Sequence, residues 1–157
     1  MKRYLPYFII ASIIALVIIG FSLKGKMNSI ISKKMKEQVT VENALSVEQA
    51  IQTKYNYVEN GLNYDFTFLE FSSTGCTVCK QMEPVLEEVR NSDKANVNVV
   101  FLHIMKSENI DMLKYYGISA VPMQVLLDRQ GNEFYRHYGY ISADEILVKA
   151  SSVLTSN

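Results

Sequence analysis

The chain is 157 residues long and electrically balanced, with 16 lysines and arginines against 16 aspartates and glutamates. This balance, without a basic stripe, gives no reason to expect a nucleic-acid partner. The two cysteines lie close together, at positions 76 and 79, which excludes a framework of structural disulfides and leaves one pair for chemistry. Without the N-terminal segments described next, about 110 residues remain, which is enough for one domain.

The N-terminal stretch predicts a membrane anchor. After the basic residues Lys2 and Arg3, the segment Leu5–Leu23 carries no charge. Its nineteen residues, at about 1.5 Å each in a helix, just cross a hydrocarbon core of roughly 30 Å. We interpret residues 1–23 as a transmembrane signal anchor. A cleaved signal peptide is the alternative, although no small-residue cleavage site follows the stretch.

The charges beside this stretch disagree about its orientation. Lys2 and Arg3 favour a cytoplasmic N-terminus, whereas the lysines between positions 24 and 36 favour the opposite. Because a short basic start is typical of an export signal, we expect a single-pass protein of the cell membrane. Its catalytic domain is then expected outside the cytoplasm.

Residues 24–45 are polar and rich in lysine, and they predict a juxtamembrane tether that is helical for part of its length. The tether is expected to be solvated, with contact between its lysines and anionic lipid headgroups as the alternative. Ser46 and Gln49 have the spacing of a capping box, which predicts a helix that starts at Ser46 and buries Val47 and Ile51. The folded domain is therefore predicted to span residues 46–157.

The two cysteines lie between a predicted strand and a predicted helix. An aromatic-rich strand ends at Phe71, and apolar residues recur at helical spacing from Met82 onwards. Cys76 thus lies at a helix N-terminus, where backbone N–H groups and the helix dipole stabilise a thiolate, so we expect it to have a lowered pKa and to be the nucleophile. Cys79, one helical turn later, is placed to close a disulfide and release whatever Cys76 has attacked.

Two other interpretations of this cysteine pair remain open, an inert pair and half of a zinc site. Structural zinc needs four protein ligands, and only His103 and His137 are available to join the cysteines, on separate predicted strands. Thiol–disulfide chemistry is favoured over both, with no metal and no cofactor expected.

Glu70 is the candidate proton acceptor for Cys79. It lies between Leu69 and Phe71 in the strand that leads to the cysteines, and a buried carboxylate there has a raised pKa. Such a group takes the proton from a thiol as that thiol attacks. A solvated carboxylate at the strand end is the alternative.

The remaining pattern alternates strands and helices. Strands are predicted at Val97–Met105, from Val121–Pro122 onwards and at Glu133–Tyr138, with helices at Ser107–Tyr115 and after a second capping box at Ser142. This order predicts an α/β sandwich with a mixed central sheet flanked by helices.

From about Ser46 to the C-terminus, the sequence resembles the thioredoxin family. The resemblance rests on the strand, the two cysteines with Lys80, then Pro84, the Val121–Pro122 loop and Gly139, in that order. It implies a thioredoxin-like sandwich and a cis peptide bond before Pro122. It also implies that the backbone of Val121 pairs with the substrate chain, and that Glu70 replaces the family's buried aspartate.

The chain departs from the family's pattern at the cysteines. Gly75 stands on the substrate-facing surface where the family usually has tryptophan, and Thr-Val separates the cysteines instead of Gly-Pro. His103 falls near the family's buried lysine and is a candidate for tuning the site.

The sequence therefore predicts a membrane-tethered thiol–disulfide oxidoreductase that reduces disulfides of extracytoplasmic proteins. A dithiol oxidase or isomerase and a non-catalytic adaptor or redox sensor are the alternatives. The resemblance implies two kinds of partner, protein disulfide substrates and a polytopic membrane thiol transporter that donates electrons.

Overall fold

The computed structural model describes residues 7, 10, 12–15, 18 and 29–154. None of the helices in this described part is long and apolar enough to cross a membrane. Most of the Leu5–Leu23 stretch lies outside the described residues, so the transmembrane anchor stays a prediction.

A four-stranded mixed sheet forms the centre of the domain. Its strands are β1 (Phe66–Ser72), β2 (Val97–His103), β3 (Met123–Leu127) and β4 (Glu133–Tyr138). They lie in the order β2-β1-β3-β4, with β1 parallel to β2 and the other neighbours antiparallel. Every residue of β1 and β3 is buried, as expected for central strands covered on both faces.

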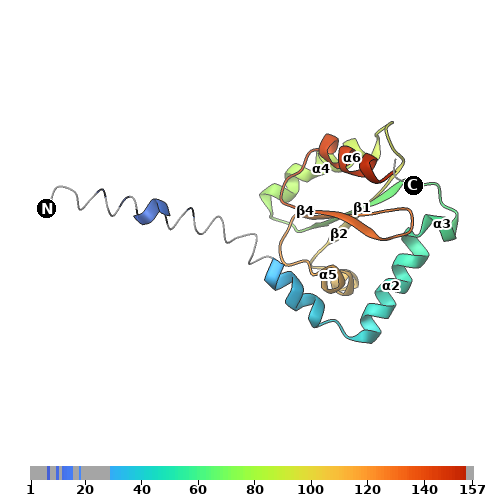
Figure 1. Cartoon of the computed structure of the whole chain (residues 1–157), viewed down its shortest axis with the longest axis horizontal. Coiled ribbons are helices and arrows are strands. Elements are labelled where there is room, and N and C mark those ends of the chain that lie inside the picture. The colour runs from blue at the N-terminus through green and yellow to red at the C-terminus, as the bar shows by residue number, and fades with distance from the viewer. Residues whose placement is uncertain (1–6, 8–9, 11, 16–17, 19–28, 155–157) are drawn as a thin grey trace.

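Helices cover both faces of this sheet (Figure 1). On one face lie α4 (Thr77–Arg90) and α6 (Ala143–Leu154), and on the other lie α2 (Val41–Tyr55) and α5 (Ile110–Tyr116). Two short elements, α3 (Tyr57–Asn60) and the 3₁₀ helix η1 (Ser107–Asn109), complete the connections. The predicted α/β sandwich with a mixed sheet is confirmed.

Strand alternation divides the core into two layers. Phe66 and Phe68 pack with Met82 of α4 and Ile146 of α6, whereas Leu69 lies in the layer beneath α2 and α5. Even-numbered residues of β1 therefore face α4, and this periodicity turns the side chain of Glu70 toward the helix that carries the cysteines.

The predicted helix start at Ser46 is wrong. Helix α2 begins at Val41, and the side chain of Thr40 accepts a hydrogen bond from the backbone N–H of Asn43. A domain boundary between residues 45 and 46 would divide this helix. The second predicted capping box is present, because Ser142 and Glu145 exchange hydrogen bonds at the start of α6.

Part of the predicted tether packs against the domain. Residues 29–37 are helical and lie beside the turn that follows α5 (Figure 1). Gly117, which ends α5 with φ of +64°, approaches this helix so closely that an added Cβ would lie 2.5 Å from the backbone oxygen of Ser32. The segment is therefore docked against the domain and is not a wholly solvated tether.

Candidate active site

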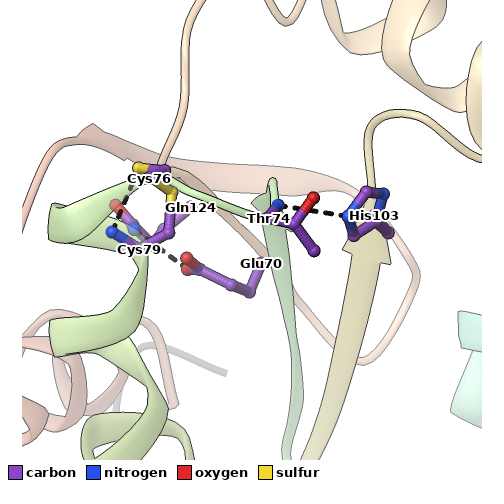
Figure 2. The surroundings of a disulfide bond; sticks show 6 residues. All are labelled: Glu70, Thr74, Cys76, Cys79, His103 and Gln124. Atoms are coloured by element: carbon purple, nitrogen blue, oxygen red, sulfur yellow. Dashed lines mark hydrogen bonds between the residues drawn. A yellow bond between two sulfur atoms is a disulfide. The ribbon is translucent and has the colours of Figure 1, made fainter.

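The turn from β1 into α4 holds both cysteines. Cys76 is the N-cap residue of α4 and Cys79 lies in its first turn. They form a disulfide with their Cα atoms 5.2 Å apart (Figure 2). Cys76 is half-buried, whereas Cys79 is only 4% exposed. This difference in exposure fits the predicted roles of an attacking thiol and a resolving thiol.

Local backbone geometry supports a thiolate on Cys76. The backbone N–H of Cys79 donates a hydrogen bond to Cys76 Sγ at 3.2 Å, and the helix N-terminus adds its partial positive charge. Both interactions favour a negatively charged sulfur.

Gly75 makes the sharp entry into this helix possible. Its φ of +81° lies in the left-handed region, which glycine adopts without steric cost. An added Cβ would meet no atom within 4 Å, so the backbone conformation and not the available space favours glycine here. Gly75 is also the position at which the thioredoxin family usually has a tryptophan.

The carboxyl group of Glu70 lies beneath this turn and has no exposed surface. Gln124 lies opposite Glu70 in the antiparallel pairing of β1 with β3, and its Nε2 donates a hydrogen bond to Glu70 Oε2 at 2.9 Å (Figure 2). Burial raises the pKa of Glu70 to about 8, against the opposing effect of this hydrogen bond. In the disulfide form, Glu70 is therefore protonated at neutral pH.

The predicted cis peptide bond between Val121 and Pro122 is confirmed. It immediately precedes β3, whose first residue, Met123, pairs with Phe71 near the end of β1. The cis-proline loop and the cysteine turn thus lie at the same end of the sheet. The backbone N–H of Gly139 donates to the carbonyl oxygen of Pro122 at 2.9 Å, which fixes the loop to the segment after β4.

His103, the candidate for tuning the site, contacts the loop that precedes the cysteines. It lies at the end of β2, and its Nε2 accepts a hydrogen bond from the backbone N–H of Thr74 at 3.2 Å (Figure 2). His103 therefore holds the loop that precedes Gly75 and Cys76. His137 contacts the backbone oxygen of Tyr140 at 3.0 Å, away from the cysteine pair in sequence and on β4.

Two residues of this region were missed at the level of sequence. Gln124 is a polar residue within an otherwise apolar, fully buried strand, and that contrast was the available signal. Tyr140 is 51% exposed and directly follows Gly139, whose backbone N–H donates to the carbonyl oxygen of Pro122. No motif marks Tyr140, because its position follows from the hydrogen bond between Gly139 and Pro122.

The described part of the chain contains no group of three or more histidine, cysteine, aspartate or glutamate side chains arranged to hold a metal ion. The cysteine pair is occupied by its disulfide. The arrangement is that of a redox pair: a partly accessible sulfur, a buried sulfur, and a buried carboxyl group in the layer between sheet and helix.

Comparisons with known proteins point to the same fold. The thioredoxin-like domain family matches residues 57–150. The chain is similar to the thioredoxin-like protein HCF164, chloroplastic, of Arabidopsis thaliana, with 28% identity over 89 residues that cover 57% of this chain and 34% of the relative. It spans about a quarter to about a third of the length of the curated relatives it matches.

Solved structures give the same result. A thioredoxin-like protein from Clostridium perfringens superposes with a TM-score of 0.52 and 27% identity, covering 60% of this chain and 75% of that chain. Thioredoxin NaTrxh from Nicotiana alata superposes with a TM-score of 0.51 and 25% identity, covering 70% of this chain and 84% of that chain.

Proposed function

The chain belongs to the thioredoxin-like domain family, and we propose that it is a membrane-tethered thiol–disulfide oxidoreductase that reduces disulfides of proteins outside the cytoplasm. The observation that carries the proposal is the disulfide between Cys76 and Cys79 at the start of α4, with the protonated carboxyl group of Glu70 buried in the same layer as Cys79. An accessible sulfur, a buried sulfur and a carboxyl group that holds the proton once the disulfide has closed fit the end state of disulfide reduction.

The reaction begins with the dithiol form of the protein. The Cys76 thiolate attacks one sulfur of the substrate disulfide, the substrate's S–S bond breaks, and its other sulfur leaves as a thiolate that takes a proton from water. Cys76 and the substrate are then joined by a mixed disulfide. In this proposal the backbone of Val121, beside the cis bond to Pro122, holds the substrate chain by strand-like hydrogen bonds.

The second step releases the substrate. Cys79 gives its proton to the carboxylate of Glu70, and its sulfur attacks Cys76 Sγ. The intramolecular disulfide forms as the bond to the substrate breaks, and the substrate's remaining sulfur leaves as a thiolate. Two electrons have then passed from the cysteine pair to the substrate, and Glu70 carries a proton. The raised pKa of Glu70 in the disulfide form is consistent with that end state.

Three features support the reducing direction and the location. Glu70 resembles the buried acid of reducing thioredoxins. Many oxidising relatives have a histidine between the two cysteines, and this chain has none there. The apolar Leu5–Leu23 stretch supports a membrane tether. A catalytic domain outside the cytoplasm needs electrons carried across the membrane, so the proposed donor is a polytopic membrane thiol transporter.

Insulin reduction by the purified full-length chain tests the activity. With dithiothreitol as electron donor, the wild-type protein should accelerate precipitation of the reduced insulin B chain, whereas Cys76→Ser should leave only the uncatalysed rate. Failure of the wild-type protein to turn over with any thiol donor would contradict the oxidoreductase and favour a non-catalytic adaptor.

The location has a separate test. The protein should stay in the membrane fraction after a carbonate wash, and Cys76, once reduced, should react with a membrane-impermeant thiol reagent in intact cells. Protection of Cys76 until the cells are lysed would place the domain inside and contradict the proposed topology.

A further inference from the structure

Gln124 places a neutral polar side chain in the layer between the sheet and α4. It lies in the central strand β3, is 1% exposed, and alternates with residues that face α2 and α5. Its amide group lies beside the carboxyl group of Glu70 (Figure 2). A buried amide in a central strand carries a desolvation cost, so its contacts need an explanation.

Glu70 and Gln124 each have one side-chain oxygen without a hydrogen-bond partner among the described residues. Gln124 Nε2 donates to Glu70 Oε2, but Glu70 Oε1 and Gln124 Oε1 are buried and have no partner among the described residues. Both unpartnered atoms are oxygens, so neither Glu70 Oε1 nor Gln124 Oε1 is committed to another side chain of the described residues. A donor is added to this layer when Cys79, which faces the sheet from α4, carries a thiol S–H in the dithiol form.

We propose that Gln124 is a positioning residue for proton transfer from Cys79: its amide N–H fixes one oxygen of the Glu70 carboxylate and leaves the other free to take the proton. The inference rests on the proposed function, because it concerns the resolving step of that reaction. The hydrogen bond of Gln124 goes to Glu70, so Gln124 acts through the carboxylate and not on a sulfur atom.

The proton balance of the step is as follows. The step starts from mixed-disulfide molecules in which Glu70 has released its proton, so that Glu70 is a carboxylate with Oε2 held by Gln124 and Cys79 is a thiol. The S–H proton moves to the free oxygen Oε1, the Cys79 sulfur attacks Cys76 Sγ, and the substrate thiolate leaves. The proton then stays on Glu70 Oε1, the carboxyl oxygen that has no partner among the described residues in the disulfide form.

An amide suits this position better than the alternatives. It does not titrate, so it donates to the carboxylate without competing for the proton, whereas a second carboxyl group would compete. An apolar side chain would leave the charged form of Glu70 without a hydrogen bond in a buried layer. Burial raises the pKa of Glu70 and the Gln124 hydrogen bond lowers it. In the dithiol form, Cys79 adds a thiol on the buried face of α4.

The test compares Gln124→Met with Leu126→Met in the full-length chain. Methionine has nearly the volume of both residues it replaces, and Leu126 is a buried neighbour on the same strand and the same face. The reduced proteins are mixed with 5,5′-dithiobis(2-nitrobenzoic acid) in a stopped-flow instrument. The first thiolate released reports the attack by Cys76, and the second reports the closing of the disulfide by Cys79.

Gln124→Met should leave the first release unchanged and slow the second by about 10- to 100-fold, the range for one hydrogen bond to a charged group. Leu126→Met should leave both within about twofold of wild type. In a Glu70→Gln background, adding Gln124→Met should slow the second release no further, because the amide acts through the carboxylate. An unchanged second release, or equal slowing in both backgrounds, would overturn the inference.

A spectroscopic measurement keeps the inference separate from the proposed function. In the oxidised protein, the infrared carbonyl band of protonated Glu70 should disappear as pH rises through about 8. Gln124→Met should move that midpoint to higher pH, because a charge-assisted hydrogen bond to the carboxylate is lost. An unmoved midpoint would overturn the role of Gln124 even if insulin reduction succeeds. A moved midpoint in a protein without reductase activity would support the contact and contradict the function.

Discussion

Replacing the buried acid should make the stability of the disulfide form nearly independent of pH. Burial raises the pKa of Glu70 from 4.5 to about 8. Between these values, the folded protein keeps a proton that the unfolded chain has released, so the free energy of unfolding of the wild type falls as pH rises through this window. Glu70→Gln removes the titrating group but retains a side chain of the same shape, so the fall should disappear.

The size of the effect follows from the same pKa. One pKa unit corresponds to about 1.36 kcal/mol, so moving from 4.5 to about 8 corresponds to about 5 kcal/mol when the pH reaches or exceeds the folded value. Urea unfolding of the oxidised full-length chain, measured between about pH 5 and 9, gives the free energy at each pH. The free energy of unfolding of Glu70→Gln should exceed that of the wild type by an amount that grows as the pH rises across that range.

An exposed acid provides the matched control. Glu145 is exposed, and its hydrogen bonds with Ser142 lower its pKa. Glu145→Gln should therefore leave the dependence of the free energy of unfolding on pH above about pH 6 as in the wild type. If wild type and Glu70→Gln give parallel curves over the whole range, the carboxyl group of Glu70 is charged or solvated in the folded protein. The proton-acceptor assignment would then be wrong.

Two further substitutions test contacts away from the sulfur atoms. Gly117→Ala should displace the helix of residues 29–37 and speed its cleavage by a lysine-specific protease. Gly61→Ala is the control, because Gly61 also has a positive φ but an added Cβ would meet no atom within 4 Å. Equal cleavage of the two variants would contradict the docking of this helix. His103→Ala should lower the free energy of unfolding by about 1 kcal/mol and speed hydrogen exchange of the Thr74 amide, and unchanged exchange would show that the Thr74–His103 bond does not protect it.

The cysteine turn and the order of strands were predictable because their signals are local. The aromatic run before Cys76 and the helical spacing after it indicate a strand and a helix without reference to distant residues. The cis bond at Pro122 was predictable only through the family resemblance, since most bonds before proline are trans.

The start of α2 shows where a local pattern fails. Ser46 has the spacing of a capping residue, but residues 41–45 are also compatible with a helix, and Thr40 provides the cap that forms. A capping box indicates a possible helix start and does not reveal whether a helix has already begun upstream.

Contacts between distant segments were beyond sequence reasoning. The pairing of Glu70 with Gln124 depends on the register of β1 against β3, which brings together residues 54 positions apart. The packing of residues 29–37 on Gly117 likewise depends on where two surface segments meet. Neither leaves a periodic signal in its own stretch of sequence.

The division of labour between the two cysteines is the central claim, and trapping tests it most directly. The single variants Cys79→Ser and Cys76→Ser of the full-length chain are each incubated with insulin, and mass spectrometry identifies the protein sulfur in any mixed disulfide. Because Cys76 is the more exposed thiol and lies at the helix N-terminus, Cys79→Ser should accumulate an adduct through Cys76. Cys76→Ser, left with the buried Cys79, should trap far less. Equal trapping by the two variants, or trapping only through Cys79, would contradict the account.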